Sequence, residues 1–256
     1  MEVLAQTRVR IWEGFSLWMI DAVPEALRAR QRTDMHAHHA IQLTIGLGGR
    51  FRVETASGAA SEAACAVAPD TEHCLAAEGL VAHLFIEPES RDGRAIQNSL
   101  LAGEPIGPIP DEAVDAFRAE IARALTEGDG DEAWADIVRR LIEQLAGRRP
   151  YVAQDWRVRR MIAHAAEHVA QPVSLGELVP VCGLSVSRLS HLFVEQTGLP
   201  FRSYLLWLRL TRAVAATAAG LTLTEAAHDA GFSDSAHLSR TFRRMFGVTA
   251  ASIRIS

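Results

Sequence analysis

The sequence lacks lysine entirely, has three cysteines in 256 residues, and contains no apolar run near the roughly 20 residues that a membrane-spanning helix needs. All 26 basic residues are therefore arginine, a bias that we attribute to the codon usage of a GC-rich genome. Three cysteines without a framework spacing exclude a disulfide scaffold and favour reduced thiols. The N-terminus carries acidic residues and no signal-like apolar stretch, so we expect a cytoplasmic protein without membrane contact.

The composition is that of a globular protein, with 48% hydrophobic and 22% charged residues, which excludes disorder and collagen-like repeats. The net charge of −5 is divided unevenly along the chain. Residues 1–150 hold 15 Arg and 24 acidic residues, whereas residues 151–256 hold 11 Arg and 7 acidic residues. A basic rear behind an acidic front is typical of a protein whose rear part alone binds a polyanion, although a solvated helix face explains the same modest surplus.

The front of the chain has the pattern of a β domain. In residues 8–90, short apolar or alternating runs are separated by turn residues such as Gly48-Gly49 and Pro69-Asp70. This spacing is typical of a barrel or a sandwich. It predicts strands at 41–47, 51–53, 65–67 and 80–86.

The pattern changes to a helical one after residue 110. Apolar stripes at 114–125 and 134–145 predict two amphipathic helices, followed by a Gly- and Pro-containing linker at 147–150. The two stripes either pair protomers, which we expect next to a linker, or pack against the preceding domain. From Asp155, a predicted helix cap, every segment is helical in pattern. The fold class that follows is a two-domain α+β protein with an all-α C-terminal domain.

An internal repeat marks the C-terminal domain. Ser174 and Thr222 each open a capping-box pattern, with a Glu three residues later, and the two boxes lie 48 residues apart. Matching residues continue at offsets of 48 and then 49, as far as Gly198 with Gly247. Each unit has a short capped helix, a glycine turn and a second helix, which is the plan of a helix-turn-helix motif.

In both second helices the apolar residues share one face, which leaves polar residues on the other. Leu189, Leu192 and Phe193 point inward in the first unit, and Leu238 and Phe242 do so in the second. Hydroxyl, imidazole and guanidinium groups on the outer face are the groups that read the groove edges of DNA. Two such units in tandem make a merely solvated face the weaker interpretation. We therefore predict DNA contacts from Ser187, Arg188, Ser190, His191, Ser235, His237, Ser239 and Arg240.

The second unit ends in GFSDSAHLSRTFRRMFGVTAASIR, which contains a Gly-Phe turn, a Phe-centred helix and a closing Gly-x-Thr. In these residues, and over 156–254 as a whole, the sequence resembles the AraC/XylS family of transcription regulators. The resemblance implies two helix-turn-helix units, joined by one long helix at 201–217, that enter successive major grooves on one face of DNA.

Four positions depart from the pattern of that family. Ala250 stands where the family usually has Pro, and Ile253 stands where it has an aromatic residue, so we expect a looser end to the fold. Pro180 lies inside the opening helix of the first unit, where it should kink the backbone. His191 stands where the family commonly has Arg. We therefore expect the second unit to dominate the affinity for DNA.

Residues 36–44 of the front domain alternate in polarity. In a strand, His36, His38 and Gln42 would share one face, and His73 on another strand would be the fourth member of the group. Burying polar groups unpaired is costly, so this face predicts a site for a polar ligand. The arrangement resembles the cupin barrel that commonly precedes the AraC-type domain, which implies a cupin-like N-terminal β-barrel with two following helices.

Three interpretations of this site are open. We favour an organic effector bound by His36, His38, Gln42 and His73 over a metal ion held by His36, His38 and His73, and over a vestigial cavity. Gln42 stands where the metal-binding cupin pattern has Glu, so we predict no cofactor. The remaining Cys and His side chains are interpreted as packing or surface residues: Cys65, Cys74, His83, His164, His168 and His228.

These features together predict a transcription regulator without enzymatic activity. Its partners would be double-stranded DNA, a small-molecule effector, a second copy of the chain and, as a further candidate, RNA polymerase. One alternative is a metal-dependent cupin dioxygenase or isomerase fused to a DNA-binding module, and another is an architectural DNA-binding protein without an effector. The predicted domains are a cupin-like sensing barrel at 1–95, a helical dimerisation segment at 96–147, a linker at 148–155 and an AraC-type double helix-turn-helix domain at 156–256.

Overall fold

The computed structural model describes residues 5–22, 32–128, 130–147 and 154–255. The chain divides into two compact units, one of residues 1–150 with 243–256 and one of residues 151–242. Most of the predicted linker at 148–155 lies outside the described residues. Helix α9 (Ser235–Phe246) begins in the second unit, and its last turn belongs to the first unit.

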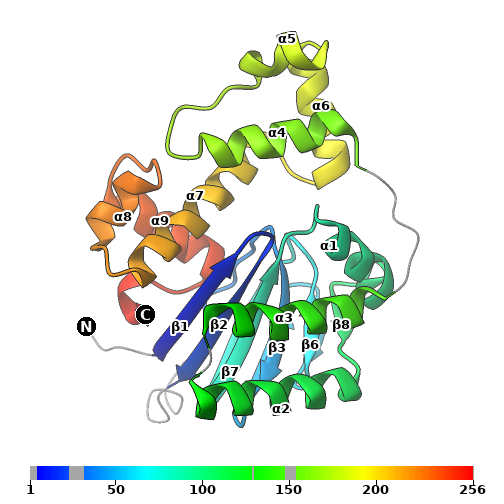
Figure 1. Ribbon diagram of the computed structural model, residues 1–256, viewed down its shortest axis with the longest axis vertical. Helices are drawn as coiled ribbons and strands as arrows, with labels where there is room; N and C mark the ends of the chain where they lie inside the picture. Colours follow the sequence, from blue (N-terminus) through cyan, green and yellow to red (C-terminus); the bar gives the residue numbers. More distant parts are fainter. Residues whose placement is uncertain (1–4, 23–31, 129, 148–153, 256) are drawn as a thin grey trace. The chain divides into compact units, whose positions relative to one another are not determined.

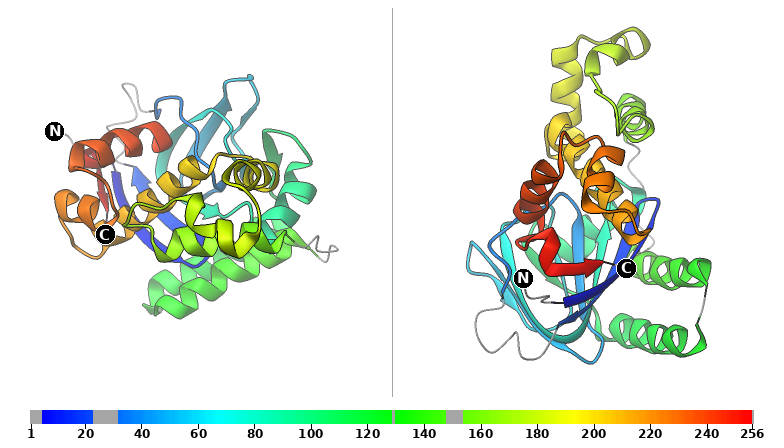
Figure 2. Two further views of the ribbon diagram at one scale, coloured as in Figure 1. Left: turned by 90° about the horizontal axis from the view of Figure 1, so that it is seen from above. Right: turned by 90° about the vertical axis from the view of Figure 1, so that its left-hand side faces the viewer.

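The first unit is built on a nine-stranded sheet in which β8, β6, β3, β7, β2, β1 and β9 follow one another in space (Figures 1 and 2). All paired strands are antiparallel except β9, which runs parallel to β1. The strands are β1 Ala5–Trp12, β2 Phe15–Ala22, β3 Ile41–Gly46, β4 Arg50–Thr55, β5 Ala60–Ser61, β6 Cys65–Val67, β7 His73–Ile86, β8 Ile106–Pro108 and β9 Ile253–Ile255.

Strand β7 holds the sheet together because it is long enough to pair with three partners. Its first half pairs with β4, from His73 opposite Thr55 to Glu78 opposite Arg50. Its second half lies between β2 and β3. The predicted β domain is confirmed as an antiparallel sheet domain, while its likeness to a cupin barrel stays a prediction.

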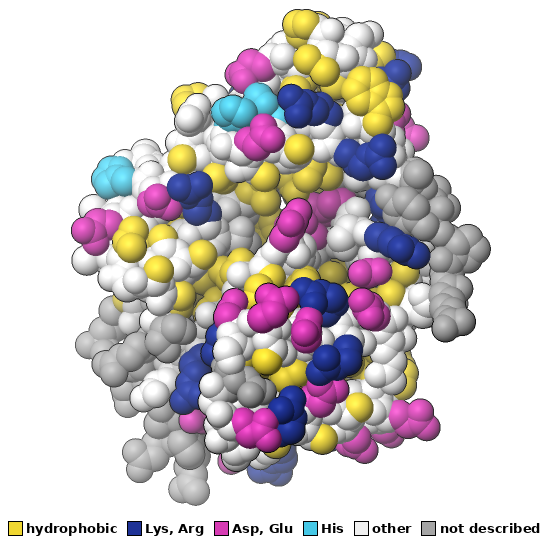
Figure 3. All heavy atoms as spheres, in the orientation of Figure 1, with side chains coloured by type: hydrophobic (Ala, Val, Ile, Leu, Met, Phe, Trp, Pro, Cys, Tyr) yellow, Lys and Arg dark blue, Asp and Glu magenta, His cyan; other side chains and the backbone are white. Residues whose placement is uncertain are grey.

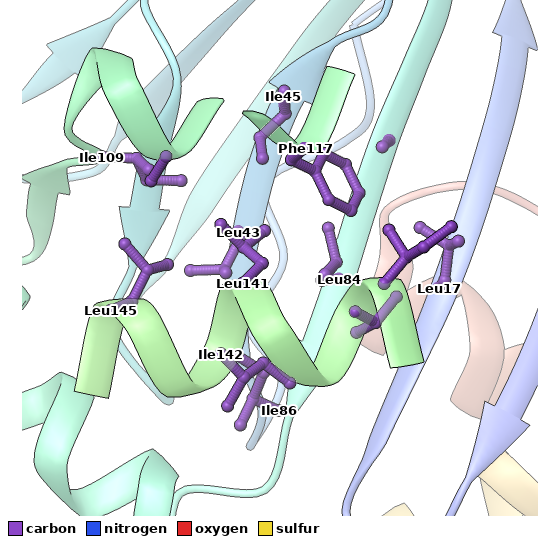
Figure 4. Packing of buried hydrophobic residues seen from close by; sticks show 14 of the residues in the cluster. Leu17, Leu43, Ile45, Leu84, Ile86, Ile109, Phe117, Leu141, Ile142 and Leu145 are labelled. Atoms are coloured by element: carbon purple, nitrogen blue, oxygen red, sulfur yellow. The ribbon is translucent and has the colours of Figure 1, made fainter. Parts of the chain in front are cut away.

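Helices α2 (Asp111–Glu127) and α3 (Asp131–Ala146) cover one face of this sheet (Figure 1). Phe117 and Leu141 belong to one buried cluster with Leu43 and Leu84 of the strands, and Figure 4 shows these side chains packed together. The outer faces of the two helices carry Arg, Asp and Glu (Figure 3). Most residues of the two stripes therefore pack against the sheet, and Leu125 of the first stripe is exposed. The stripes thus leave little apolar surface for the predicted dimer.

A short helical segment connects the sheet to these helices. It consists of α1 (Arg91–Ile96), which Ser90 caps, and the π-helical turn η1 (Gln97–Leu101). Both follow β7 directly, and β8 comes next in the chain.

The second unit is helical, as predicted. Tyr204 of the long helix, with Leu189 and Phe193, forms a buried core of the first repeat, and Phe232, Leu238 and Phe242 are buried in the second repeat. The helices are α4 Trp156–Glu167, the 3-10 turn η2 Leu175–Leu178, α5 Val179–Cys182, α6 Val186–Thr197, α7 Phe201–Ala218, α8 Leu223–Asp229 and α9, followed in the first unit by the 3-10 turn η3 Ala250–Ser252.

The capping predictions are confirmed for two helices and wrong for one. Asp155 accepts a hydrogen bond from the Arg157 amide at 2.8 Å, and Thr222 and Glu225 form a complete capping box. In the first repeat the box is not formed. Residues 175–178 make a 3-10 turn, and Glu177 bonds the His164 ring at 3.0 Å instead of the amide of its cap.

Pro180 does not kink a helix. It lies in the first turn of α5, where a backbone amide has no partner within the helix, and so the predicted single helix is divided into η2 and α5. Residues 253–255, where a looser end was expected, form β9 and pair with β1. Among the described residues, no single helix is long and apolar enough to cross a membrane, and α6 meets those criteria only when it is joined to 175–182 across a 95° bend.

Candidate nucleic-acid interface and histidine cluster

Helix α6 is the second helix of the first repeat, and α9 is the second helix of the second repeat; we call them the first and second reading helices. The first reading helix presents the residues that were predicted for it. Ser185 caps the helix by accepting from the Arg188 amide at 3.4 Å. Ser187, Arg188 and His191 are exposed and Ser190 is half-buried. Of the predicted inward residues, Leu189 and Phe193 are buried and Leu192 is half-buried. The four polar side chains therefore lie on the face that is open to a ligand.

The second reading helix, α9, presents a different mixture. Arg240 is exposed, whereas Ser235, His237 and Ser239 are half-buried. The Ser239 hydroxyl donates to the Ser235 carbonyl at 2.8 Å, and the His237 ring packs edge-on against Phe232 at 5.1 Å between centroids. Arg240 is thus the predicted contact of this helix whose side chain is most open to solvent.

Asp234 positions this helix, and the sequence analysis missed it. One carboxylate oxygen accepts from the His237 amide at 2.6 Å and the other from the Ser233 hydroxyl at 3.0 Å. These hydrogen bonds lower the pKa of Asp234 below its usual value. The signal was available, because Asp directly before a helix is a common N-terminal cap.

Two arginines of α7 serve the fold, not the outer face. Arg212 makes a two-pronged ion pair with Asp229 of α8, at 2.9 and 3.2 Å. Arg209 donates to the Val169 carbonyl at 2.9 Å and to the Gln171 carbonyl at 2.8 Å. Helix α7 is thereby tied to the segment before the first repeat and to the opening helix of the second.

In the first unit, the predicted effector residues come together as a buried cluster. The sequence pattern predicted that His36 and His38 lie in a strand, but both lie in the irregular segment before β3. There His36 forms an isolated bridge with His73. The ring centroids of His36 and His38 lie 4.3 and 5.2 Å from that of His73. One ring nitrogen of each histidine lies within 4.8 Å of one from each of the other two. All three rings are buried.

Backbone carbonyls determine the protonation of these rings. Nδ1 of His36 lies 2.8 Å from the Asp34 oxygen, and Nδ1 of His38 lies 3.1 Å from the Ala40 oxygen. Nδ1 of His73 lies 2.8 Å from the oxygen of residue 71. A carbonyl can only accept, so each Nδ1 carries the proton and each Nε2 carries a lone pair.

The environment keeps this cluster uncharged. Burial and the neighbouring His73 lower the pKa of His36 to about 4. Burial and both neighbouring imidazoles lower the pKa of His38 well below its usual value, and burial lowers that of His73. Three neutral imidazoles at pH 7 can accept hydrogen bonds or bind a metal ion.

A chain of polar side chains leads from the cluster across the sheet. Nε2 of His38 lies 3.0 Å from Gln42 Oε1, the Gln42 amide donates to the Thr44 hydroxyl at 3.0 Å, and that hydroxyl lies 3.1 Å from His83 Nδ1. His83 was expected to be a packing residue, but it belongs to this network. Burial, then the nearby His73 and His36, lower its pKa to about 3.

The end of the chain lies beside the same cluster, within the first unit. The Asp34 amide donates to the Gly247 carbonyl at 2.8 Å, and Arg243 donates to the Asp34 carboxylate at 2.8 and 3.0 Å. The Phe246 ring lies 6.1 Å from the His38 ring and 4.9 Å from Trp18, between centroids. The last turn of the second reading helix therefore packs on residues 34–38.

A second buried histidine site was missed by the sequence analysis. His39 Nε2 lies 2.9 Å from Glu89, and Nδ1 lies 3.5 Å from Asp70. Burial opposes the charge of this ring, but the hydrogen bonds to Asp70 and Glu89 outweigh burial and raise the pKa of His39 to about 9. Asp70 and Glu89 lie 31 and 50 residues from His39 in the sequence, so no local motif predicts these contacts.

The cysteines behave as buried apolar residues. Cys65, Cys74 and Cys182 are unpaired and buried. Burial raises the pKa of the Cys65 thiol to about 11, so it carries no thiolate at neutral pH. His164 was interpreted as a packing or surface residue without a partner. In the structure its ring bonds the Glu177 carboxylate.

The repeated helices α6 and α9 lie within residues 178–255, which match a helix-turn-helix domain family. The arabinose operon regulatory protein of Salmonella typhimurium is 27% identical over 156 residues, which cover 57% of this chain and 56% of that protein. The transcriptional activator RhaS of Escherichia fergusonii is 35% identical over 101 residues, or 39% of this chain and 36% of that protein. These matches support the resemblance to the AraC/XylS family of transcription regulators.

A solved structure shares the two-domain fold. The crystal structure of ToxT from Vibrio cholerae matches with a TM-score of 0.61 over 94% of this chain and 96% of that chain, at 11% sequence identity. The likeness confirms the predicted fold class, a sheet domain followed by a helical helix-turn-helix domain. The chain spans about half the length of the arabinose regulator it matches.

Proposed function

We propose that this protein is a sequence-specific DNA-binding transcription regulator whose first unit senses a small ligand at the histidine cluster. The observation that carries the proposal is the pair of matching helices, α6 and α9. They bury Leu189 with Phe193 and Leu238 with Phe242 on one face and leave polar residues accessible on the other. Arg188 and Arg240 are exposed on these helices, and arginine can bond guanine O6 and N7 together.

Coupling between ligand and DNA would run through the end of α9. Asp34 is two residues from His36 and bonds both Arg243 and Gly247. A change in the position of His36 would therefore displace the last turn of α9. A ligand can shift DNA binding only by as much as it discriminates between two arrangements of that turn.

Operator footprinting with the full chain tests this function. We expect a protected site of defined sequence, and Arg240→Ala should weaken the protection. Arg160→Ala is the matched control, because it removes the same charge from an exposed position of α4 that lies on neither reading helix. Equal protection of unrelated DNA would favour the architectural alternative.

Two further partners belong to this proposal, a second copy of the chain and RNA polymerase. Homodimer formation and contact with RNA polymerase are proposed on the family resemblance, and the buried stripes of α2 and α3 lend the dimer no support. Light scattering at micromolar concentration, with and without DNA, tests the dimer, and a monomer in both would reject it.

A further inference from the structure

We propose that His36, His38 and His73 bind one divalent transition metal ion, with Zn²⁺ as the probe. This inference rests on the proposed function only in taking the same cluster as the sensing site. It replaces the organic ligand that the sequence pattern favoured with an inorganic one.

The first argument is the donor set. Each of the three histidines offers one imidazole nitrogen, and these atoms lie within 4.8 Å of one another. Ligand atoms around a tetrahedral ion with metal–nitrogen bonds of 2.0–2.1 Å are about 3.3 Å apart, so small side-chain rotations would close the site. Neutral nitrogen donors select zinc, copper, iron or nickel over magnesium or calcium.

The second argument is the orientation of the rings. All three Nδ1 atoms face backbone carbonyls, of Asp34, Ala40 and Thr71. Metal-binding histidines usually donate their other ring proton to such a carbonyl, which fixes the tautomer and aims the free nitrogen at the ion. Here the same arrangement is present at three rings that converge.

The third argument is a buried nitrogen that nothing satisfies. Nε2 of His73 is fully buried and has no hydrogen-bond partner among the described residues. In addition, Nε2 of His38 and Oε1 of Gln42 are both acceptors and face each other at 3.0 Å. A reversed Gln42 amide relieves that second conflict without an ion. The orphaned nitrogen of His73 is therefore the observation that carries the proposal, because a cation satisfies it.

The test uses the full chain after treatment with a chelator and dialysis. Titration with Zn²⁺ in a calorimeter should show one ion per chain, and Co²⁺ should give the visible absorption bands of a tetrahedral site. His73→Ala should weaken Zn²⁺ binding by at least about 100-fold. His168→Ala is the control, because this histidine lies on the helical unit and bonds the His164 carbonyl, so its removal should leave the stoichiometry unchanged.

A second variant, His36→Gln, guards against misfolding of His73→Ala, and circular dichroism of each variant checks the fold. The absence of a stoichiometric ion in the titrated wild-type protein would overturn the proposal. So would full Zn²⁺ affinity in both variants. Footprinting of the same samples keeps the two proposals apart, since DNA binding without metal refutes only the metal site, and metal binding without DNA binding refutes only the regulator.

Discussion

Gly247 is the residue whose substitution tests the packing of the chain's end on the histidine cluster. It has φ of +68°, and a Cβ atom built there would lie 2.4 Å from the Asp34 carbonyl oxygen and 2.6 Å from His36 Nδ1. Real Cβ atoms essentially never approach this closely. The substitution Gly247→Ala must therefore displace either the end of α9 or the segment that carries His36.

The repeat supplies a matched control. Gly198 occupies the corresponding position after α6, with φ of +85°, and a Cβ there would meet nothing within 4 Å. Alanine in the left-handed region costs about 1–2 kcal/mol at either position. Forcing an extra methyl into packed structure adds about 1–3 kcal/mol, and only Gly247→Ala carries this addition.

Calorimetric unfolding of the two variants checks the difference, because it resolves transitions of separate units where a single two-state fit does not apply. We expect a loss of about 1–2 kcal/mol for Gly198→Ala and of about 2–5 kcal/mol for Gly247→Ala. Equal losses would refute the reasoning, since they would mean that residues 34–36 do not crowd Gly247.

Three further predictions concern the helical unit. Arg240→Ala should cost roughly 1–3 kcal/mol in operator affinity by fluorescence anisotropy, because it removes an exposed guanidinium from α9. A larger loss for His191→Ala would show that the first unit dominates instead. Thr222→Ala should lower the free energy of unfolding by about 1 kcal/mol in urea, and Ser174→Ala by less, because only Thr222 forms the complete capping box. Operator affinity should fall steeply as salt rises, through counterion release, and a salt-independent affinity would contradict contacts with phosphates.

Much of the helical unit could be predicted because its signals are local. The spacing of Leu189 and Phe193, or of Leu238 and Phe242, defines a helix face within two turns, and both pairs are buried. The long helix expected at 201–217 is α7, Phe201–Ala218. The exception is Glu177, whose capping role failed because the chain offered it a distant partner in His164.

The histidine site could be predicted only in part. The alternating polarity of residues 36–44 predicted that His36, His38 and Gln42 lie close to His73. The histidines do lie together, although His36 and His38 precede the strand and are not part of it. His83 was missed because its partner, Thr44, lies 39 residues away on a neighbouring strand. A pairing register across a sheet is set by backbone hydrogen bonds that no short stretch of sequence contains.

The sequence by itself determined the class of each half of the chain, the tandem repeat and the polar faces of its second helices, because helix periodicity and capping depend on neighbours within a few residues. Only the tertiary structure decided where α2 and α3 bury their stripes, that His39 meets Glu89, and that Arg243 reaches Asp34 across 209 residues of chain. Such contacts follow from which surfaces pack together, and packing is a property of the whole folded unit.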